Sequence, residues 1–139
     1  MSSENAKFKP QGLHHVEIYV SDLEKSKQFW SWFLGLLGYE AFQSWDQGFS
    51  YMYGNSYIVF VQTLKQHLTP EYHRCRTGLN HLAFWAVSAE QIAEVTGLLK
   101  ARGVEILYED RHPYPGGSDY SSVFFEDPDR IKVELVAAL

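Results

Sequence analysis

"GLNHLAFWAV" at residues 78–87 repeats the pattern of "GLHHVEIYV" at residues 12–20. In both stretches large apolar residues alternate with other types, which is typical of a strand with one buried face. Both also place a histidine near the start of the strand, at His15 and His81. Two similar strands in one chain indicate that the sequence contains an internal repeat.

A helix is predicted to follow each of these strands. "SDLE" and "SAEQ" come directly after them, and each has the spacing of a capping box, so Ser21 and Ser88 are expected to cap the two helix starts. The helices are expected to end at Gly38 and Gly103, because glycine readily adopts the left-handed conformation that closes a helix.

Three strand-like segments follow each predicted helix. They are "YEAFQSW", "GFSYMYG" and "SYIVFVQT" in the first half, and "VEILYE", "YSSVFFE" and "IKVELVA" in the second. Both halves therefore follow the order βαβββ. We expect a single α+β domain over residues 1–139, with module one at about 13–63, a linker at 64–78 and module two at about 79–137. The two modules should pair into one curved mixed sheet with the helices outside and a concave interior.

Composition and charge exclude several classes of partner. The formal net charge is −5 and no run of Lys or Arg occurs, so neither nucleic acid nor an anionic membrane surface is expected as a partner. No apolar run reaches the ~18–20 residues of a membrane span, and residues 1–10 lack the apolar core of a signal peptide. The single Cys75 cannot form an internal disulfide. These features predict a cytoplasmic protein.

The alternation of side chains assigns each strand residue to a face of the sheet. His14 falls on the aliphatic face by this rule and is therefore not chosen as a site residue. Three strands are predicted to share one design, with an aliphatic face toward the helix and an opposite face that carries one metal-ligand type. The opposite faces hold His15, Glu17 and Tyr19; His81, Ala83 and Trp85; and Lys132, Glu134 and Val136.

His15, His81 and Glu134 are therefore predicted to point into the same interior. Two imidazoles and one carboxylate form the set that holds a divalent metal with open positions, as in non-haem Fe(II) sites. A zinc site with three protein ligands and a water fits equally well. The alternative is a buried polar network without metal.

Further candidates lie around this metal site. Glu17 shares a face with His15 and is a candidate catalytic base or a hydrogen-bond acceptor for a ligating imidazole; pairing with a lysine at the rim is the alternative. The segment 110–119, rich in Pro and Gly, is a loop of the kind that often borders a site. The candidates for the substrate pocket are Tyr19, Trp85, His112 and Tyr120.

The chain resembles the vicinal oxygen chelate superfamily, which includes glyoxalase I, fosfomycin-resistance thiol transferases, extradiol dioxygenases and bleomycin-binding proteins. The resemblance covers Leu13 to Val136, and its carriers are "HHVEIYVSDLEKSKQFW", "GLNHLAFWAV" and "FFEDPDRIKVELV". It implies two βαβββ modules around a metal pocket. The family's ligand positions fall on His15, His81 and Glu134.

Two positions depart from the family pattern. Glyoxalase I members usually have a fourth ligand, a glutamate in the last strand of module one, but here the matching position is Phe60 or Val61. Gln62 is the nearest polar residue. Arg130 stands where the family turn often has glycine. A site with three ligands is more similar to those of the thiol transferases and dioxygenases, although extradiol enzymes are usually longer.

The resemblance leaves two classes of function open. The first is a metal-dependent enzyme that uses Fe, Zn, Ni or Mn to chelate adjacent oxygens of a small-molecule substrate, with lyase, thiol transferase or dioxygenase chemistry. The second is a metal-free protein of the bleomycin-resistance type that sequesters a small molecule. Family members commonly form homodimers, in some cases exchanging modules so that ligands come from two chains, and the sequence does not decide this.

Overall fold

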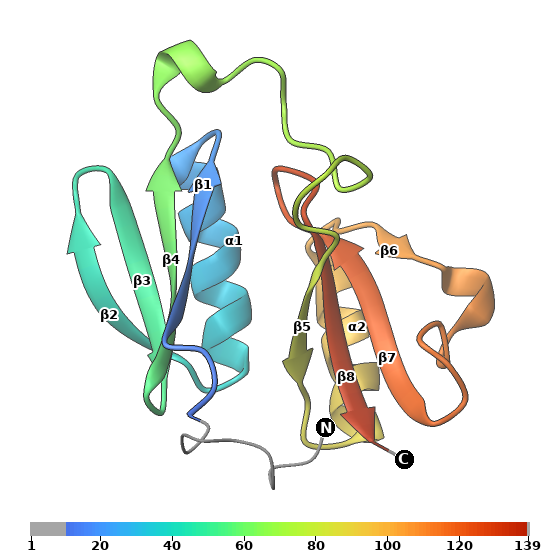
Figure 1. The fold of residues 1–139 in the computed structure, drawn as a ribbon. Helices are drawn as coiled ribbons and strands as arrows, with labels where there is room; N and C mark the ends of the chain where they lie inside the picture. The colour runs from blue at the N-terminus through green and yellow to red at the C-terminus, as the bar shows by residue number, and fades with distance from the viewer. Residues whose placement is uncertain (1–10, 139) are drawn as a thin grey trace, which may run out of the picture.

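The computed structural model describes residues 11–138, and they fold into two modules of the same order (Figure 1). Module one consists of β1 (His15–Val20), α1 (Leu23–Leu36), β2 (Glu40–Trp45), β3 (Gly48–Tyr53) and β4 (Ser56–Gln62). Module two consists of β5 (Leu82–Trp85), α2 (Ala89–Ala101), β6 (Ile106–Leu107), β7 (Tyr120–Glu126) and β8 (Lys132–Ala138). The duplicated βαβββ order is therefore confirmed.

Each module has its own four-stranded mixed sheet. The strand orders are β1-β4-β3-β2 and β5-β8-β7-β6, and in each the first strand pairs in parallel with the last. Among the described residues no strand ladder joins the two sheets, so the single continuous sheet expected from the sequence is not formed. The edge strands β1 and β5 instead border the space between the sheets (Figure 1).

Helix α1 holds the two modules together. Trp30 and Phe33 are fully buried on this helix. The Trp30 ring stacks on Phe60 of β4 with centroids 4.9 Å apart, while Phe33 meets Phe84 of β5 at 5.7 Å and Phe125 of β7 at 5.1 Å. Because aromatic rings bury large apolar areas, these contacts form one core that spans both modules.

A buried hydrogen bond also crosses between the modules. The Trp30 indole Nε1 donates to Oδ2 of Asp127, in the turn between β7 and β8, at 3.0 Å. Oδ1 of the same carboxylate accepts from the backbone N–H groups of Asp129 and Ile131, both at 2.8 Å. Burial raises the pKa of Asp127 to about 6 despite these hydrogen bonds.

The ends of the helices test the predicted caps. Ser88 caps α2 as expected and accepts from the backbone N–H of Gln91 at 3.1 Å. The cap of α1 is Asp22, not Ser21, because the hydroxyl and backbone N–H of Ser21 donate to Asp129 instead. Gly38 and Gly103 have the expected positive φ, at 90° and 77°.

Within residues 11–138, neither helix is long and apolar enough to cross a membrane.

Strand β6 is shorter than the segment "VEILYE" suggested. It pairs with β7 only at Ile106 and Leu107. Tyr108 then adopts a left-handed conformation, with φ 55° and ψ 36°, and a short 3-10 helix follows at Glu109–Arg111. The chain leaves the sheet at this point and begins the loop that precedes β7.

Candidate functional site

The strand faces follow the predicted alternation. In β1, Val16, Ile18 and Val20 pack toward the core, while His15, Glu17 and Tyr19 are exposed. The same alternation holds along β8, where Glu134 lies on the face opposite the core residues Val133 and Leu135. Each sheet therefore has one face turned away from the helices, which we call its open face.

The open face of module two brings His81 and Glu134 together. Nε2 of His81, just before β5, lies 3.1 Å from Oε1 of Glu134 on β8. Strands β5 and β8 are adjacent and parallel, with Ala83 opposite Glu134 in the ladder. The other ring nitrogen of His81, Nδ1, lies 2.7 Å from Oδ1 of Asn80. The imidazole is therefore held between two oxygen atoms.

This arrangement fits a bound cation. A neutral imidazole has one N–H, so it can donate to only one of the two oxygens, and its other nitrogen then presents a lone pair to an oxygen lone pair. If Nδ1 donates to Asn80, then Nε2 and the Glu134 carboxylate both present lone pairs to the same point. Imidazole nitrogen and carboxylate oxygen are ligands for Zn, Fe, Ni or Mn, and a hydrogen bond at the second nitrogen is the usual support of a ligating histidine.

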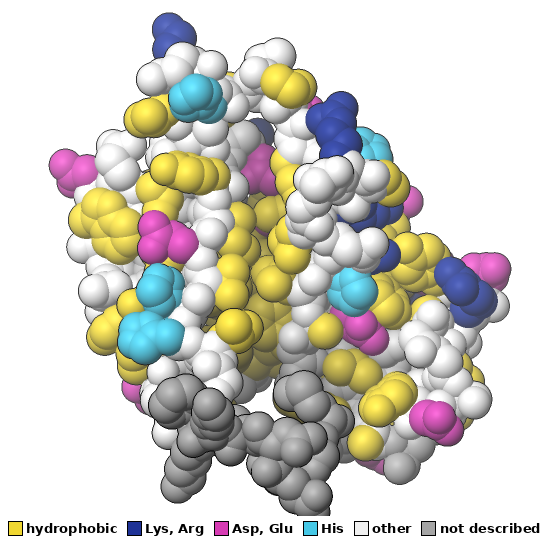
Figure 2. Space-filling model, viewed as in Figure 1, with side chains coloured by type: hydrophobic (Ala, Val, Ile, Leu, Met, Phe, Trp, Pro, Cys, Tyr) yellow, Lys and Arg dark blue, Asp and Glu magenta, His cyan; other side chains and the backbone are white. Residues whose placement is uncertain are grey.

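His15 does not join this pair within the chain. Residues 11–138 contain no group of three or more His, Cys, Asp or Glu side chains placed to hold one metal ion, so His15 lies apart from His81 and Glu134 within one chain, and the role of the three residues as metal ligands stays a prediction. The physical reason is that β1 and β5 belong to separate sheets. Figure 2 shows histidine and acidic side chains on each half of the molecule, with a hollow lined by hydrophobic side chains between the halves.

His15 occupies its own ordered place on the open face of module one. Its ring stacks on Tyr57 of β4, with centroids 4.7 Å apart and planes within 2° of parallel. Its Nε2 lies 3.8 Å from Oε1 of Glu17. Glu17, the candidate base, thus accompanies His15 and not the His81–Glu134 pair.

His14 is on the same side as His15, contrary to the expected parity. Its Nδ1 lies 2.8 Å from Nδ1 of His15, and its ring also meets Tyr57 edge-on at 5.4 Å. The strand begins only at His15, and His14 lies in a bend, so the two-residue alternation does not extend to it.

The loop before β7 approaches Glu134 through a glycine. A Cβ atom at Gly116 would lie 3.1 Å from Oε2 of Glu134 and 3.2 Å from Oγ of Ser122. Ser122 Oγ is buried and has no hydrogen-bond partner among the described residues. Because residue 116 has no side chain, the loop backbone can pass this close to both oxygen atoms. The buried Ser122 hydroxyl is left without a hydrogen-bond partner among these residues, which is uncommon for a buried polar group.

The remaining pocket candidates lie at different places. Tyr19 and Trp85 are exposed on the open faces of β1 and β5, at 69% and 72%. Tyr120 begins β7 with the same parity as Phe124, which stacks edge-on against His81 at 5.6 Å. His112 lines a pocket together with Glu109 and with Thr96 and Lys100 of α2.

The structure shows the roles of Gln62 and the backbone of Arg130, the residues at the two departures from the family pattern. Gln62 is bound to the backbone at the start of α1: its Oε1 accepts from Leu23 N at 2.9 Å and its Nε2 donates to Ser21 O at 2.8 Å. The Gln62 side chain therefore fixes β4 to the start of α1. Arg130 has φ 65°, a conformation that glycine adopts without strain, which explains why glycine suits this turn.

The sequence did not point to three residues around the His81–Glu134 pair: Asn80, Gly116 and Ser122. Asn80 directly precedes His81, and a side-chain amide next to a histidine could have been recognised in the sequence as a hydrogen-bond partner for the imidazole. Gly116 and Ser122 gave no local signal, because their role depends on a loop that folds back onto β7 and β8.

The family model of the glyoxalase/bleomycin resistance protein/dioxygenase superfamily matches residues 14–125. The chain belongs to this superfamily. The match covers most of both modules, and the βαβββ duplication agrees with it.

Several relatives and solved structures are similar to this superfamily member. The uncharacterized Bacillus subtilis protein YqjT is 56% identical over 125 residues, covering 90% of this chain and 98% of YqjT. A glyoxalase-like protein from Bacillus halodurans has a TM-score of 0.89 at 60% identity, covering 91% of this chain and 95% of its own. The Serratia marcescens glutathione transferase FosA is 29% identical over 126 residues, which cover 90% of this chain and 79% of FosA. The Listeria monocytogenes fosfomycin resistance protein FosX has a TM-score of 0.68 at 27% identity, and the match covers 94% of this chain and 96% of FosX.

Proposed function

We propose that this protein is a divalent-metal-dependent enzyme whose active site forms between two copies of the chain. His81 and Glu134 of one copy and His15 of the other hold the metal ion. The substrate is a small molecule with adjacent oxygens. This proposal keeps the three ligands predicted from the sequence and changes only how they meet.

The observation that carries the proposal is the His81–Glu134 pair, with Nε2 and Oε1 3.1 Å apart on an open sheet face. The pair supplies two ligands and leaves one side open. His15 is partly exposed on the other open face, where Tyr57 fixes its ring. Because the isologous contact of a two-fold dimer always forms twice, such a dimer would complete two equivalent sites.

A divalent ion at this place would stabilise negative charge that develops on two neighbouring substrate oxygens. Residues of the chain would transfer the proton and contact the substrate. Glu17, beside His15, is placed to accept a proton from the substrate. The exposed rings of Tyr19 and Trp85 would cover the apolar part of the substrate.

The relatives support metal chemistry without naming the reaction. A point mutant of FosX from Listeria monocytogenes has been crystallised with Mn(II) and a dihydroxypropylphosphonic acid, which bears adjacent hydroxyl groups. FosA from Serratia marcescens is a glutathione transferase. Lyase, thiol transferase and dioxygenase chemistry are all compatible with a three-ligand site, and Fe, Zn, Ni and Mn are all candidates for the metal.

The second candidate is a metal-free protein that sequesters a small molecule. It is favoured by the absence of a three-ligand group within residues 11–138 of one chain. The exposed aromatic side chains on the open faces would also suit a ligand held by shape and stacking.

Metal analysis separates the two candidates. Protein purified without chelators should contain close to stoichiometric divalent metal, and His81→Ala should lose it while keeping its circular dichroism spectrum. His73→Ala, in the linker, is the matched control and should keep the metal. Wild-type protein that binds no divalent ion after incubation with Fe(II), Zn, Ni or Mn would refute the enzyme proposal and support the sequestering protein.

A further inference from the structure

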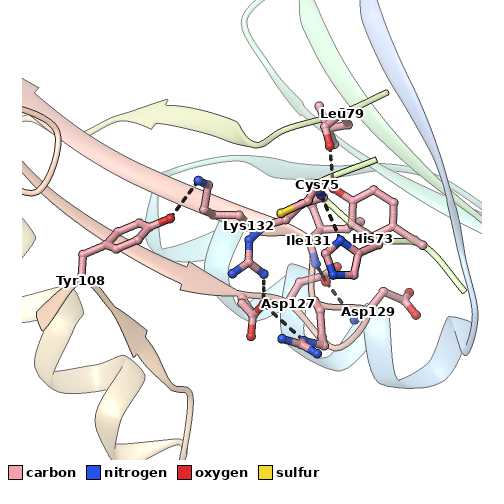
Figure 3. A network of polar contacts seen from close by, with 12 residues as sticks. His73, Cys75, Leu79, Tyr108, Asp127, Asp129, Ile131 and Lys132 are labelled. Carbon is pink, nitrogen blue, oxygen red and sulfur yellow. Dashed lines mark hydrogen bonds and ion pairs between the residues drawn. The ribbon is translucent and has the colours of Figure 1, made fainter. Parts of the chain in front are cut away.

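Lys132 lies on the open face of β8, on the same side of the strand as Glu134. Its ammonium Nζ donates a hydrogen bond to the Tyr108 hydroxyl at 3.1 Å (Figure 3). The same nitrogen lies 5.4 Å from the ring centroid of Tyr108 and 5.6 Å from that of Phe124. A partly buried cation thus lies beyond the hydroxyl end of Tyr108 and near the ring of Phe124.

No carboxylate compensates this charge among residues 11–138. Glu126 lies opposite Lys132 in the ladder between β7 and β8. Its carboxylate, however, is bound by Arg74 and by Nε of Arg130. Glu134, the other acidic side chain on this face, meets His81. A partly buried ammonium without an anion is costly, because one phenol hydroxyl and a nearby aromatic ring replace only part of its hydration.

A second cation approaches the same phenol. The Arg111 guanidinium carbon lies 4.6 Å from the ring centroid of Tyr108, and Arg111 has no ion pair with a described carboxylate. Arg111 is exposed and Lys132 is partly buried. An anion that lies near both positive side chains would be attracted by both and would offset their mutual repulsion. The two cations come from separate elements, since Arg111 ends the 3-10 helix and Lys132 begins β8.

The backbone at Tyr108 holds this arrangement in a conformation that costs free energy. Its φ of 55° is uncommon for a residue other than glycine, asparagine or aspartate. Such residues concentrate at ligand sites, where the surrounding structure maintains them. Here the left-handed turn ends β6 and places the phenol beside Lys132 and Arg111.

We propose that Lys132, Arg111 and the Tyr108 hydroxyl form a binding subsite for an oxyanion, the carboxylate or phosphate-type group of a substrate. Phe124 connects this subsite to the metal ligands, because its ring lies 5.6 Å from both the Lys132 ammonium and the His81 ring. One small molecule can therefore span both. The inference rests on the proposed function in one respect, since it assigns a charge to the substrate of that site.

Anion binding to metal-free protein tests the subsite directly. We expect chelator-treated wild type to bind inorganic phosphate saturably by titration calorimetry. Lys132→Met, which keeps most of the apolar stem, should weaken that binding roughly tenfold or more. Lys132→Arg should restore most of it. Lys100→Met is the matched control, because Lys100 is already paired with Glu109, and it should bind phosphate like wild type.

Two further arms make the result unambiguous. A parallel titration with acetate shows whether the subsite prefers a carboxylate or a phosphate. Lys132→Met should also keep the metal content and melting temperature of wild type. The inference is overturned if wild type does not bind either anion, or if Lys132→Met binds as wild type does. Loss of phosphate binding in Lys132→Met with its metal content retained supports the subsite. Wild type that cannot be loaded with any divalent ion but binds phosphate through Lys132 would refute only the proposed metal chemistry.

Discussion

The imidazole of His81 faces the carboxylate of Glu134 across 3.1 Å, although 53 residues separate them in the chain. The contact exists because β5 and β8 pair in parallel at the edge of the second sheet. Asn80 fixes the ring from its other side, at 2.7 Å from Nδ1. The orientation of His81 toward Glu134 is therefore set by a neighbouring residue as well as by the strand.

Removing the support of His81 should weaken metal binding. Asn80→Ala deletes the acceptor at Nδ1, so the imidazole can rotate or change tautomer. We expect the metal dissociation constant to rise roughly 10- to 100-fold, the range typical of such supporting hydrogen bonds. Competition with a metal indicator dye measures this. Asn55→Ala, in the turn between β3 and β4, is the control, and equal affinities in the two variants would contradict the assigned role of Asn80.

Filling the space beside Glu134 should also impair the site. Gly116→Ala would place a methyl group 3.1 Å from Oε2 of Glu134, which forces the loop or the carboxylate to move. We expect weaker metal binding with little change in overall stability, because the loop lies at the surface. Gly97→Ala in α2 meets no atom within 4 Å and should stabilise the fold by about 1 kcal/mol with unchanged metal affinity. Unaltered metal affinity in Gly116→Ala would show that the loop is free to yield.

Asp127 should make stability depend on pH. Burial raises the pKa of this carboxyl from 3.8 to about 6, so the folded protein binds the proton more tightly than the unfolded chain. The resulting stabilisation is present at low pH and is lost as the pH rises from about 4 to about 6, by an amount on the order of 3 kcal/mol.

Asp127→Asn isolates this effect, because asparagine stays neutral. The difference between the unfolding free energies of wild type and variant should therefore shrink as the pH rises through that window. The variant also turns an amide NH2 toward the Trp30 N–H, which should cost about 1–3 kcal/mol at every pH. Urea unfolding at several pH values measures both effects. Parallel stability curves for the two proteins would refute the raised pKa.

Gly48 should be essential for the first sheet. A Cβ at this position would lie 2.7 Å from the backbone oxygen of Phe60 and would overlap the Trp45 ring. We expect Gly48→Ala to destabilise the protein by about 1–3 kcal/mol, the usual cost of overpacking. Gly35→Ala in α1 has open space and should be neutral or stabilising. Thermal unfolding compares the two, and an equal melting temperature for both would contradict the crowding at Gly48.

The periodicity of the sequence predicts each module well because it reports local burial. Val16 and Ile18 alternate with His15 and Glu17 in the structure as they do in the pattern. Gly38 and Gly103 end their helices for a reason that is also local, the left-handed backbone. The placing of His81 and Glu134 on one face was predictable as well, since His81 is the counterpart of His15 in the repeat and the alternation along the last strand puts Glu134 opposite Val133 and Leu135.

The relation between the modules was not predictable in the same way. It depends on the packing of Trp30 and Phe33 against both sheets, which no pattern within one strand contains. His15 is therefore on the correct face but not beside His81. Helix starts depend on competition between neighbours, and Asp22 caps α1 because Ser21 binds Asp129.

Mixed dimers test most directly whether His15 of one chain completes the site of another. His15→Ala and Glu134→Gln proteins should each lack metal when purified alone. Co-expressed with different affinity tags and purified as mixed dimers, they should regain about half of the wild-type metal content, because one of the two sites then has all three native ligands. Full metal retention in His15→Ala alone, or no metal in the mixed dimers, would contradict a site built from two chains.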